Sequence, residues 1–136
     1  MIVALISCVS KKTLHSAMAK DLYISPLFRG AYKYAKKQCA DKIFILSAKY
    51  GLVSENKIID SYDETLNTKS KIEIIKWAEN VLLDLSKEAD LKKDRFLILA
   101  GEKYRKFIIG ELENYTIPLK GLSIGKQLSY YKGELE

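Results

Sequence analysis

The sequence is poor in the residues that build metal centres and disulfide frameworks. Its 136 residues include one histidine, His15, and two cysteines, Cys8 and Cys39. Their spacing matches no zinc-binding pattern, so we expect neither a metal nor a cofactor. A disulfide between the two cysteines is not expected in a reducing compartment.

Long apolar runs are also missing. The longest, Met1–Ile6 and Phe96–Ala100, have the length of strands, whereas a membrane helix needs about 20 apolar residues. Met1–Ile6 has neither a basic segment before it nor a small-residue cleavage site after it, so it does not resemble a signal peptide. We therefore expect a soluble cytoplasmic protein with no membrane partner.

Acidic residues are scarce in the first part of the chain. Residues 1–57 carry ten Lys or Arg and three acidic residues. Residues 58–136 carry thirteen Lys or Arg and fourteen acidic residues. The net charge of +6 therefore arises in the first 57 residues. Two interpretations stay open, an anionic partner such as nucleic acid or a solvated lysine-rich helix face.

Strand-sized apolar runs alternate with helical periodicity, and the length fits one α/β domain over residues 1–136. We predict strands at 2–7, 43–47 and 95–100, and a short fourth strand or extended segment at 116–119. We predict helices at 26–39, 70–89, 102–113 and 124–131. This order indicates a three-layer fold, with a mostly parallel sheet of about four strands and helices on both faces.

Capping residues support two of these helices. Ser25 is a candidate N-cap before Pro26, and Ser70 with Glu73 fits a capping box. The expected apolar face of the first helix comprises Leu27, Ala31, Tyr34 and Ala35. The expected apolar stripe of the second comprises Ile72, Ile75, Ala78, Leu82 and Leu85. The polar residues 48–69 between them predict a long loop, a feature that is often functional.

Ligands of open α/β sheets bind beyond the carboxyl ends of the strands, and the first polar strand exit is Ser7–Lys12. The hydroxyls of Ser7 and Ser10 and the ammonium groups of Lys11 and Lys12 suit an anion, although the segment lacks the glycines of a P-loop. Cys8 is a candidate nucleophile with a lowered thiol pKa, or a small core residue. The two lysines bind phosphate or are ordinary surface residues.

The second polar exit begins at Ser47, a candidate ligand-binding residue. Gly51 favours a sharp turn with positive φ, which would present Lys49 and Tyr50 as candidate catalytic groups. Tyr50 would stack on a base or donate a hydrogen bond, or else pack under the long loop. Within that loop, Asp63 is the candidate general base, or a turn-forming residue.

The third polar exit contains Gly101, which allows a ligand to approach the start of the next helix. Glu102, Tyr104 and Arg105 are candidate ligand-binding residues in that helix. Arg105 would pair with phosphate through two hydrogen bonds or remain a surface charge, and Glu102 would alternatively be a first-turn partner of the helix dipole.

A last turn before a helix, near the end of the chain, adds two further candidates. Gly125 and Gln127 either close the site through their amides or cap the domain. We assign no function to His15, because a loop histidine is usually solvated.

Six phrases in this order carry a family resemblance: LISCVSKK, DLYISPLFRGAYKYA, ILSAKYGLV, YDETLN, LAGEKYR and PLKGLSIGKQL. Together they resemble a small family of bacterial, archaeal and phage proteins that are often labelled as related to the peroxide-stress protein YaaA. Ser47–Leu52 followed by Asp60–Tyr62 is similar to YaaA itself, which is larger and is associated with DNA binding and oxidative DNA damage. At the level of fold alone, the order of elements also resembles uracil-DNA glycosylases.

Three functions follow from these observations. The first is nucleic-acid association, in which Lys11, Lys12 and the lysines of 33–37 hold phosphates. The second is an enzyme of nucleobases, nucleosides or nucleotides that cleaves an N-glycosidic bond with Asp63. The third is a non-catalytic module that binds a protein through a tyrosine-rich surface. The oligomeric state stays open.

Overall fold

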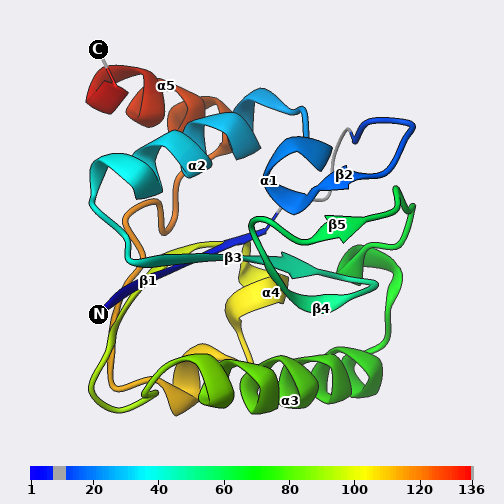
Figure 1. Cartoon of the computed structure of the whole chain (residues 1–136). Coiled ribbons are helices and arrows are strands. Elements are labelled where there is room, and N and C mark those ends of the chain that lie inside the picture. The colour runs from blue at the N-terminus through cyan, green and yellow to red at the C-terminus, as the bar shows by residue number, and fades with distance from the viewer. Residues whose placement is uncertain (8–11, 136) are drawn as a thin grey trace.

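The computed structural model describes residues 1–7 and 12–135, which form a central sheet between two layers of helices (Figure 1). The sheet has five strands in the order β4-β3-β1-β6-β7. Their bounds are β1 (Ile2–Ser7), β3 (Lys42–Ser47), β4 (Gly51–Ser54), β6 (Arg95–Leu99) and β7 (Asn114–Thr116). Only β4 is antiparallel to its neighbour, so the predicted mostly parallel α/β fold is confirmed.

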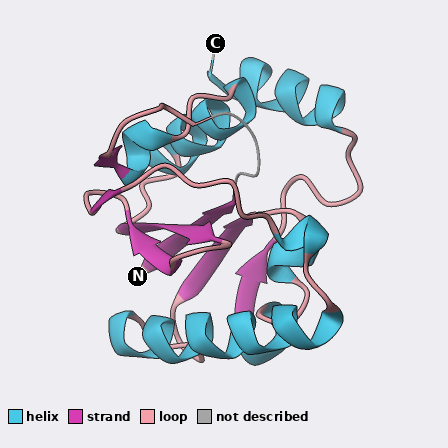
Figure 2. Ribbon diagram, turned by 90° about the vertical axis from the view of Figure 1, so that its right-hand side faces the viewer, coloured by secondary structure: helices cyan, strands magenta, loops and turns pink. Residues whose placement is uncertain are grey.

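Helices cover both faces of this sheet (Figures 1 and 2). On one face lie α2 (Pro26–Lys37) and α5 (Ile124–Leu135), and on the other α3 (Lys71–Glu88) and the short α4 (Glu102–Arg105). Two core clusters fill the spaces between the layers. Strand β1 contributes Ala4 and Ile6 to the first cluster and Val3 and Leu5 to the second, because successive side chains point to opposite faces.

A smaller unit lies beside the carboxyl ends of the parallel strands (Figure 1). It consists of α1 (Ala19–Leu22) and an antiparallel pair of two-residue strands, β2 (Ala17–Met18) and β5 (Ile58–Ile59). Two 3-10 helices complete the fold, η1 (Leu66–Thr68) and η2 (Ile109–Glu111).

The position of β1 creates the switch point of the sheet. The chain leaves β1 through α2 to reach β3, and later passes through α3 on the opposite face to reach β6 on the other side of β1. Connections that depart to opposite faces leave a crevice at the carboxyl ends of neighbouring strands. The crevice here lies between β1 and β6.

The predicted helix caps are confirmed. The Ser25 side chain accepts a hydrogen bond from the Phe28 amide at 3.3 Å, with Pro26 in the first turn. At the start of α3, the Glu73 amide donates to Ser70 Oγ at 3.2 Å, and the Ser70 amide donates to Glu73 Oε1 at 3.1 Å. Both helices therefore begin where the sequence predicts.

The predicted buried stripe of α3 is confirmed at Ala78 and Leu85 and was wrong at Ile72. Ile72 is 69% exposed, and the buried face consists of Ile74, Trp77, Ala78, Val81 and Leu85. Apolar residues occupy both stripes, so spacing alone did not distinguish them. The Trp77 indole donates to the Ser47 carbonyl at 2.8 Å, which fixes the helix with that face toward the sheet.

The predicted loop at 48–69 was wrong in part, because β4, β5 and η1 all lie within it. Gly51 has a φ of +74°, a conformation that turns β3 back into the antiparallel β4. Strands this short, interrupted by a polar segment at 54–57, leave no clear two-residue period in the sequence.

The helix predicted at 102–113 begins at Glu102 as expected but was wrong in its length, since α4 ends at Arg105. The next amides bond three residues back: Ile108 to the Arg105 carbonyl and Leu112 to the Ile109 carbonyl. This tighter winding, with Gly110 inside it, replaces the α-helix. Likewise, the strand predicted at 116–119 lies at 114–116, because Pro118 has no amide to donate.

Candidate functional site

A cavity of about 640 Å³ lies at the crevice between β1 and β6. Its walls come from the ends of these two strands, α4, η1, the first turns of α2 and α5, and the segment after β7. The volume falls within the range typical of small-molecule sites. The cavity therefore occupies the place where the topology predicts a ligand.

One end of the cavity presents hydrogen-bond donors. Ser7 Oγ accepts a hydrogen bond from the Gly101 amide at 3.0 Å, so its hydroxyl proton remains free to point elsewhere. Arg105 Nη1 donates to the Ala100 carbonyl at 2.9 Å, which fixes the guanidinium across the β6–α4 turn. Lys103 Nζ lies 3.5 Å from the Asn67 carbonyl.

These donors are oriented before any ligand arrives. Arg105 retains further N–H groups and its charge, and a positioned guanidinium suits a carboxylate or phosphate. Among the described residues that line the cavity, Glu102 is the only carboxylate, beside two cations, Lys103 and Arg105. The local charge therefore favours an anionic ligand group.

The other end is apolar. It is lined by Leu27 and Phe28 of α2, by Leu119, and by the α5 residues Leu128 and Tyr131. Phe28 and Tyr131 are almost fully buried, whereas Leu128 is 37% exposed. This half would bury the apolar body of a ligand, including a flat ring beside Phe28.

Two helices of twelve residues begin at the cavity, α2 at Pro26 and α5 at Ile124. Neither carries an acidic residue in its first turn. The positive ends of the helix dipoles are thus uncompensated by carboxylates of their own. They add to the preference for a negative group set by Arg105.

The second predicted exit forms a separate cluster. Ser47 is fully buried, and its Oγ accepts hydrogen bonds from the amides of Lys49 at 3.2 Å and Tyr50 at 2.9 Å. Ser47 therefore shapes the turn, and the positive φ of Gly51 is confirmed. Lys49 is exposed, with its Nζ 5.3 Å from the Tyr50 ring. These residues do not line the cavity.

Tyr50 belongs to an aromatic cluster. Its ring lies edge-on to Tyr62 at 5.6 Å, and the hydroxyls of Tyr62 and Tyr23 are 2.5 Å apart. Lys12 Nζ lies 4.4 Å from the centre of the Tyr62 ring, within cation–π distance. The alternative interpretation of Tyr50, as a residue packed beneath the 48–69 segment, fits this contact.

Asp63 follows this cluster in the chain and is exposed. It does not line the cavity. Cys8, Ser10 and Lys11 lie outside the residues that the structure describes, so their predicted roles stay predictions.

The structure brings Ser7 of the first predicted segment together with residues of the third and last segments. Six of the predicted residues line one cavity: Ser7, Gly101, Glu102, Tyr104, Arg105 and Gln127. Tyr104 is buried, and its hydroxyl accepts a hydrogen bond from the Leu66 amide at 3.3 Å. Gly125 is exposed and does not line the cavity.

Sequence reasoning missed several lining residues, among them Asn67, Lys103, Leu119, Leu128 and Tyr131. Tyr131 follows Gln127 by four residues in a predicted helix, so helical spacing would have placed both on one face. Lys103 lies inside the third polar exit. Asn67 and Leu119 carry no such signal, because tertiary folding alone brings them to the cavity.

Most of the tyrosines expected to form a binding surface lie in the core. Of the nine tyrosines in the sequence, five are buried: Tyr23, Tyr34, Tyr62, Tyr104 and Tyr131. Their rings pack against one another or against other core side chains, and only Tyr115 is more than a third exposed. Tyrosine content thus largely reflects the core of this protein, and the interaction-module hypothesis stays a prediction.

Within the described ranges 1–7 and 12–135, no group of three or more His, Cys, Asp or Glu side chains is placed to hold a metal. None of the helices described there combines the length and apolar character needed to cross a membrane.

The fold and the cavity together define a parallel α/β protein with a candidate ligand site at its switch point. The chain belongs to DUF6884, a family of unknown function whose model matches residues 3–133. It is 30% identical over 105 residues to the uncharacterized protein YfjM of Bacillus subtilis (strain 168), covering 74% of this chain and 68% of YfjM. No solved structure matches the chain significantly. Neither match names YaaA, so the relation to that protein stays a prediction.

Proposed function

We propose that this protein binds a nucleotide-like small molecule in the cavity between β1 and β6. The anionic group lies against Ser7, Lys103 and Arg105, and the base lies in the apolar half between α2 and α5. The observation that carries this proposal is the set of pre-oriented donors at the switch point. Donors held by backbone groups lose little freedom when a ligand binds.

The volume and polarity of the cavity support the nucleotide class. A cavity of about 640 Å³ accommodates a ligand the size of a nucleoside monophosphate. Such a ligand carries an oxyanion at one end and a flat, weakly polar ring at the other, which matches the two halves of the lining. We also propose a cytoplasmic location, because the exposed Cys39 is a free thiol, which suits a reducing compartment.

Calorimetry and thermal unfolding with AMP, GMP, CMP and UMP test the proposal. A ligand present at 100 times its Kd stabilises the folded state by about 2.7 kcal/mol. Arg105→Gln removes one charge-assisted interaction, so we expect binding to weaken by about 1.5–3 kcal/mol.

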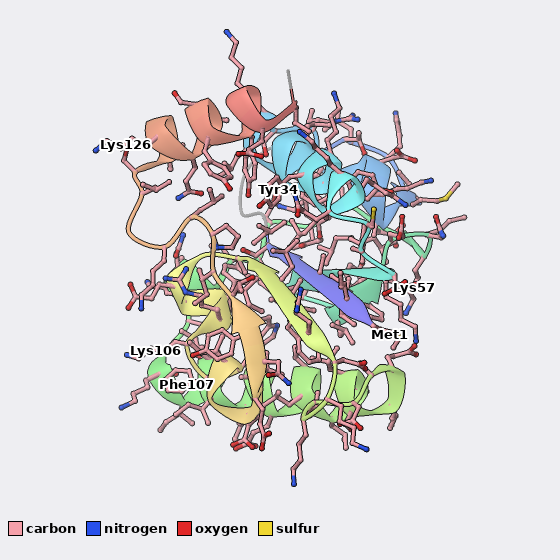
Figure 3. The ribbon with its side chains drawn as sticks, turned by 90° about the vertical axis from the view of Figure 1, so that its left-hand side faces the viewer. Met1, Tyr34, Lys57, Lys106, Phe107 and Lys126 are labelled. Carbon is pink, nitrogen blue, oxygen red and sulfur yellow. The ribbon has the colours of Figure 1, made fainter. Side chains whose placement is uncertain are left out.

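Lys106→Gln is the matched control, because it removes a neighbouring charge outside the cavity lining. Lys106 is exposed, and its Nζ lies 5.6 Å from the Phe107 ring (Figure 3). We expect this variant to bind like the wild type. Absence of binding for all four nucleotides, or equal losses in the two variants, would contradict the proposed site.

Nucleic-acid association is a second candidate, supported by the charge of α2. This helix carries four basic residues, Arg29, Lys33, Lys36 and Lys37, and no acid, whereas α3 carries three basic and four acidic residues. Arg29, Lys33 and Lys37 are spaced by four residues, so they form one stripe. Lys36 is paired with Glu55 at 3.3 Å, and Lys37 donates to the Glu134 carbonyl. Arg29 and Lys33 make no ion pair with any described residue.

Fluorescence anisotropy of labelled single- and double-stranded DNA across a salt series tests this candidate. Removing one phosphate interaction reduces the slope of log K against log salt by about 0.9 on duplex DNA. Arg29→Glu/Lys33→Glu should therefore flatten the slope by about 2, and Lys76→Glu/Lys87→Glu on α3 should leave it unchanged. Similar slopes for both double variants would remove the α2 surface as the DNA-binding face.

A further inference from the structure

Helix α5 places two polar groups, Gln127 and Tyr131, in the apolar half of the cavity. They are four residues apart, so they lie one above the other on the same face of the helix. Most other side chains in this half are apolar, including Leu27, Leu119 and Leu128. Polar groups in such surroundings fix the orientation and identity of a ligand more than its affinity.

The Gln127 amide has a defined orientation. Its Nε2 lies 2.9 Å from the Leu122 carbonyl oxygen. A carbonyl oxygen only accepts hydrogen bonds, so the atom facing it must be the NH₂ group. Oε1 is therefore the atom left to accept a hydrogen bond from a ligand, and the half-buried side chain is held in place by the start of its own helix.

Tyr131 supplies the complementary group. The residue is 3% exposed, and its hydroxyl makes no hydrogen bond with the described residues. In residues 1–7 and 12–135, every side-chain oxygen or nitrogen that is fully buried has a hydrogen-bond partner. Because the Tyr131 hydroxyl has none, its oxygen is not fully buried, and solvent or a ligand can reach it. Burial raises the pKa of Tyr131 well above its usual value, so the hydroxyl remains protonated and can donate.

The Tyr131 ring is rigidly placed. It packs directly on Gly30 of α2, where an added Cβ atom would lie 2.8 Å from the ring. Its centre is also 5.7 Å from the Tyr34 ring. A hydroxyl on a ring held from two sides has little freedom to adapt, so it selects among ligands by geometry.

We propose that Gln127 and Tyr131 are specificity-determining residues that read the hydrogen-bonding edge of the bound base. Gln127 Oε1 accepts an N–H of the base, and the Tyr131 hydroxyl donates to an adjacent ring nitrogen or carbonyl oxygen. Each of the four common bases presents a donor beside an acceptor, so the positions of these two groups on the base decide which nucleotide binds best. This inference rests on the proposed nucleotide site.

The test compares nucleotides with a ligand that has no base. Calorimetry of the full chain measures binding of AMP, GMP, CMP, UMP and ribose 5-phosphate to the wild type, Tyr131→Phe and Gln127→Met. Each substitution removes one neutral hydrogen bond, so we expect the favoured nucleotide to bind about fivefold to tenfold more weakly. Ribose 5-phosphate should bind all three proteins equally.

Tyr130→Phe is the matched control. It removes a hydroxyl from the adjacent position of α5, where Tyr130 contacts the Tyr34 hydroxyl at 3.3 Å and does not line the cavity. We expect this variant to retain wild-type base selectivity.

The outcomes separate this inference from the proposed function. If Tyr131→Phe and Gln127→Met weaken ribose 5-phosphate as much as nucleotides, or change neither, the pair does not read the base and the inference is overturned while the nucleotide site stands. If the wild type binds ribose 5-phosphate and every nucleotide equally, the base is not read at all. If it binds none of them, the proposed function falls and this inference with it.

Discussion

At the scale of single residues, the cavity raises the question of which carboxylate would act in N-glycosidic chemistry. Asp63 is the candidate from the sequence, but it is exposed and does not line the cavity. Glu102 does line it, next to the donors Lys103 and Arg105. A carboxylate that stabilises a developing positive charge on a sugar must lie close to that sugar.

If the cavity cleaves glycosidic bonds, Glu102→Gln should abolish base release and Asp63→Asn should leave it close to wild type. Chromatographic detection of free base from nucleosides and nucleotides measures this directly, with circular dichroism to verify folding. Loss of activity in folded Asp63→Asn, with Glu102→Gln still active, would return the general-base role to Asp63.

Cys39 is a second residue whose conformation has an energetic consequence. It has a φ of +60° immediately after the α2 cap, with its amide bonded to the Lys36 carbonyl and the Ala40 amide to the Ala35 carbonyl. This hydrogen-bond pattern ends many helices, usually with glycine at the left-handed position. A residue with a Cβ atom is strained there.

Cys39→Gly should therefore stabilise the protein by about 1 kcal/mol in urea unfolding. Gln38→Gly is the matched control, because Gln38 has an ordinary φ of −77° and glycine there only increases the freedom of the unfolded chain. A loss of stability in Cys39→Gly would indicate that the side chain contributes more than its backbone strain costs.

At the scale of elements, the docking of α5 on α2 controls the shape of the cavity. The contact depends on Gly30, because any side chain there would collide with Tyr131. Both residues adjoin the site, since Tyr131 lines the cavity and Ala31 follows Gly30 in its wall. Helix packing and ligand binding thus share one contact.

Gly30→Ala should destabilise the protein by about 1–3 kcal/mol through overpacking and weaken nucleotide binding. Gly133→Ala is the matched control, since it adds a methyl group to α5 where nothing lies within 4 Å. Urea unfolding measures the loss of stability, and calorimetry measures the nucleotide affinity. Normal nucleotide affinity in Gly30→Ala would show that α5 does not need its present position to form the site.

The α3 capping box provides a pH-dependent contribution to stability. Hydrogen bonds from the Ser70 backbone and side chain lower the pKa of Glu73. A group with a depressed pKa in the folded state stabilises the protein above its unfolded pKa, and this contribution is lost as pH falls through the folded pKa. Glu73→Gln should therefore destabilise the protein at pH 7. It should have no such effect at pH values below the folded-state pKa of Glu73.

Urea unfolding of wild type and Glu73→Gln at several pH values from 7 to below the folded pKa measures this difference. Glu79→Gln controls for the removal of a charge, because Glu79 is an exposed residue of the same helix. A difference between wild type and Glu73→Gln that stays constant with pH would mean that the capping carboxylate does not titrate differently in the two states.

At the scale of the whole molecule, the layered fold was predictable and the details of the site were not. Strands such as 2–7 and 95–99 are buried on both faces, so their continuous apolar runs identify them without long-range information. The rule that ligands bind at carboxyl strand ends then selected Ser7 and Gly101, which do meet. Asn67 and Leu119 reach the same cavity only through packing, which leaves no local pattern.

The switch between the two sides of β1 was equally hidden. Nothing in residues 2–7 indicates that their neighbours are 42–47 on one side and 95–99 on the other. The second polar exit does lie beside the first, because β3 pairs with β1 and Ser7 is opposite Leu46, but its Ser47 and Tyr50 belong to the β3–β4 turn and the aromatic cluster.

The central place of β1 has a consequence for how the chain folds as it is synthesised. Ile2 pairs with Arg95, so one edge of β1 stays unpaired until residues 95–99 have also been synthesised. Meanwhile a fully apolar segment with two open edges must avoid pairing with other chains. Contacts this distant in sequence slow folding, and incompletely paired chains are prone to aggregate. We therefore expect slower translation through residues 42–99 to lengthen the time during which β1 is incompletely paired.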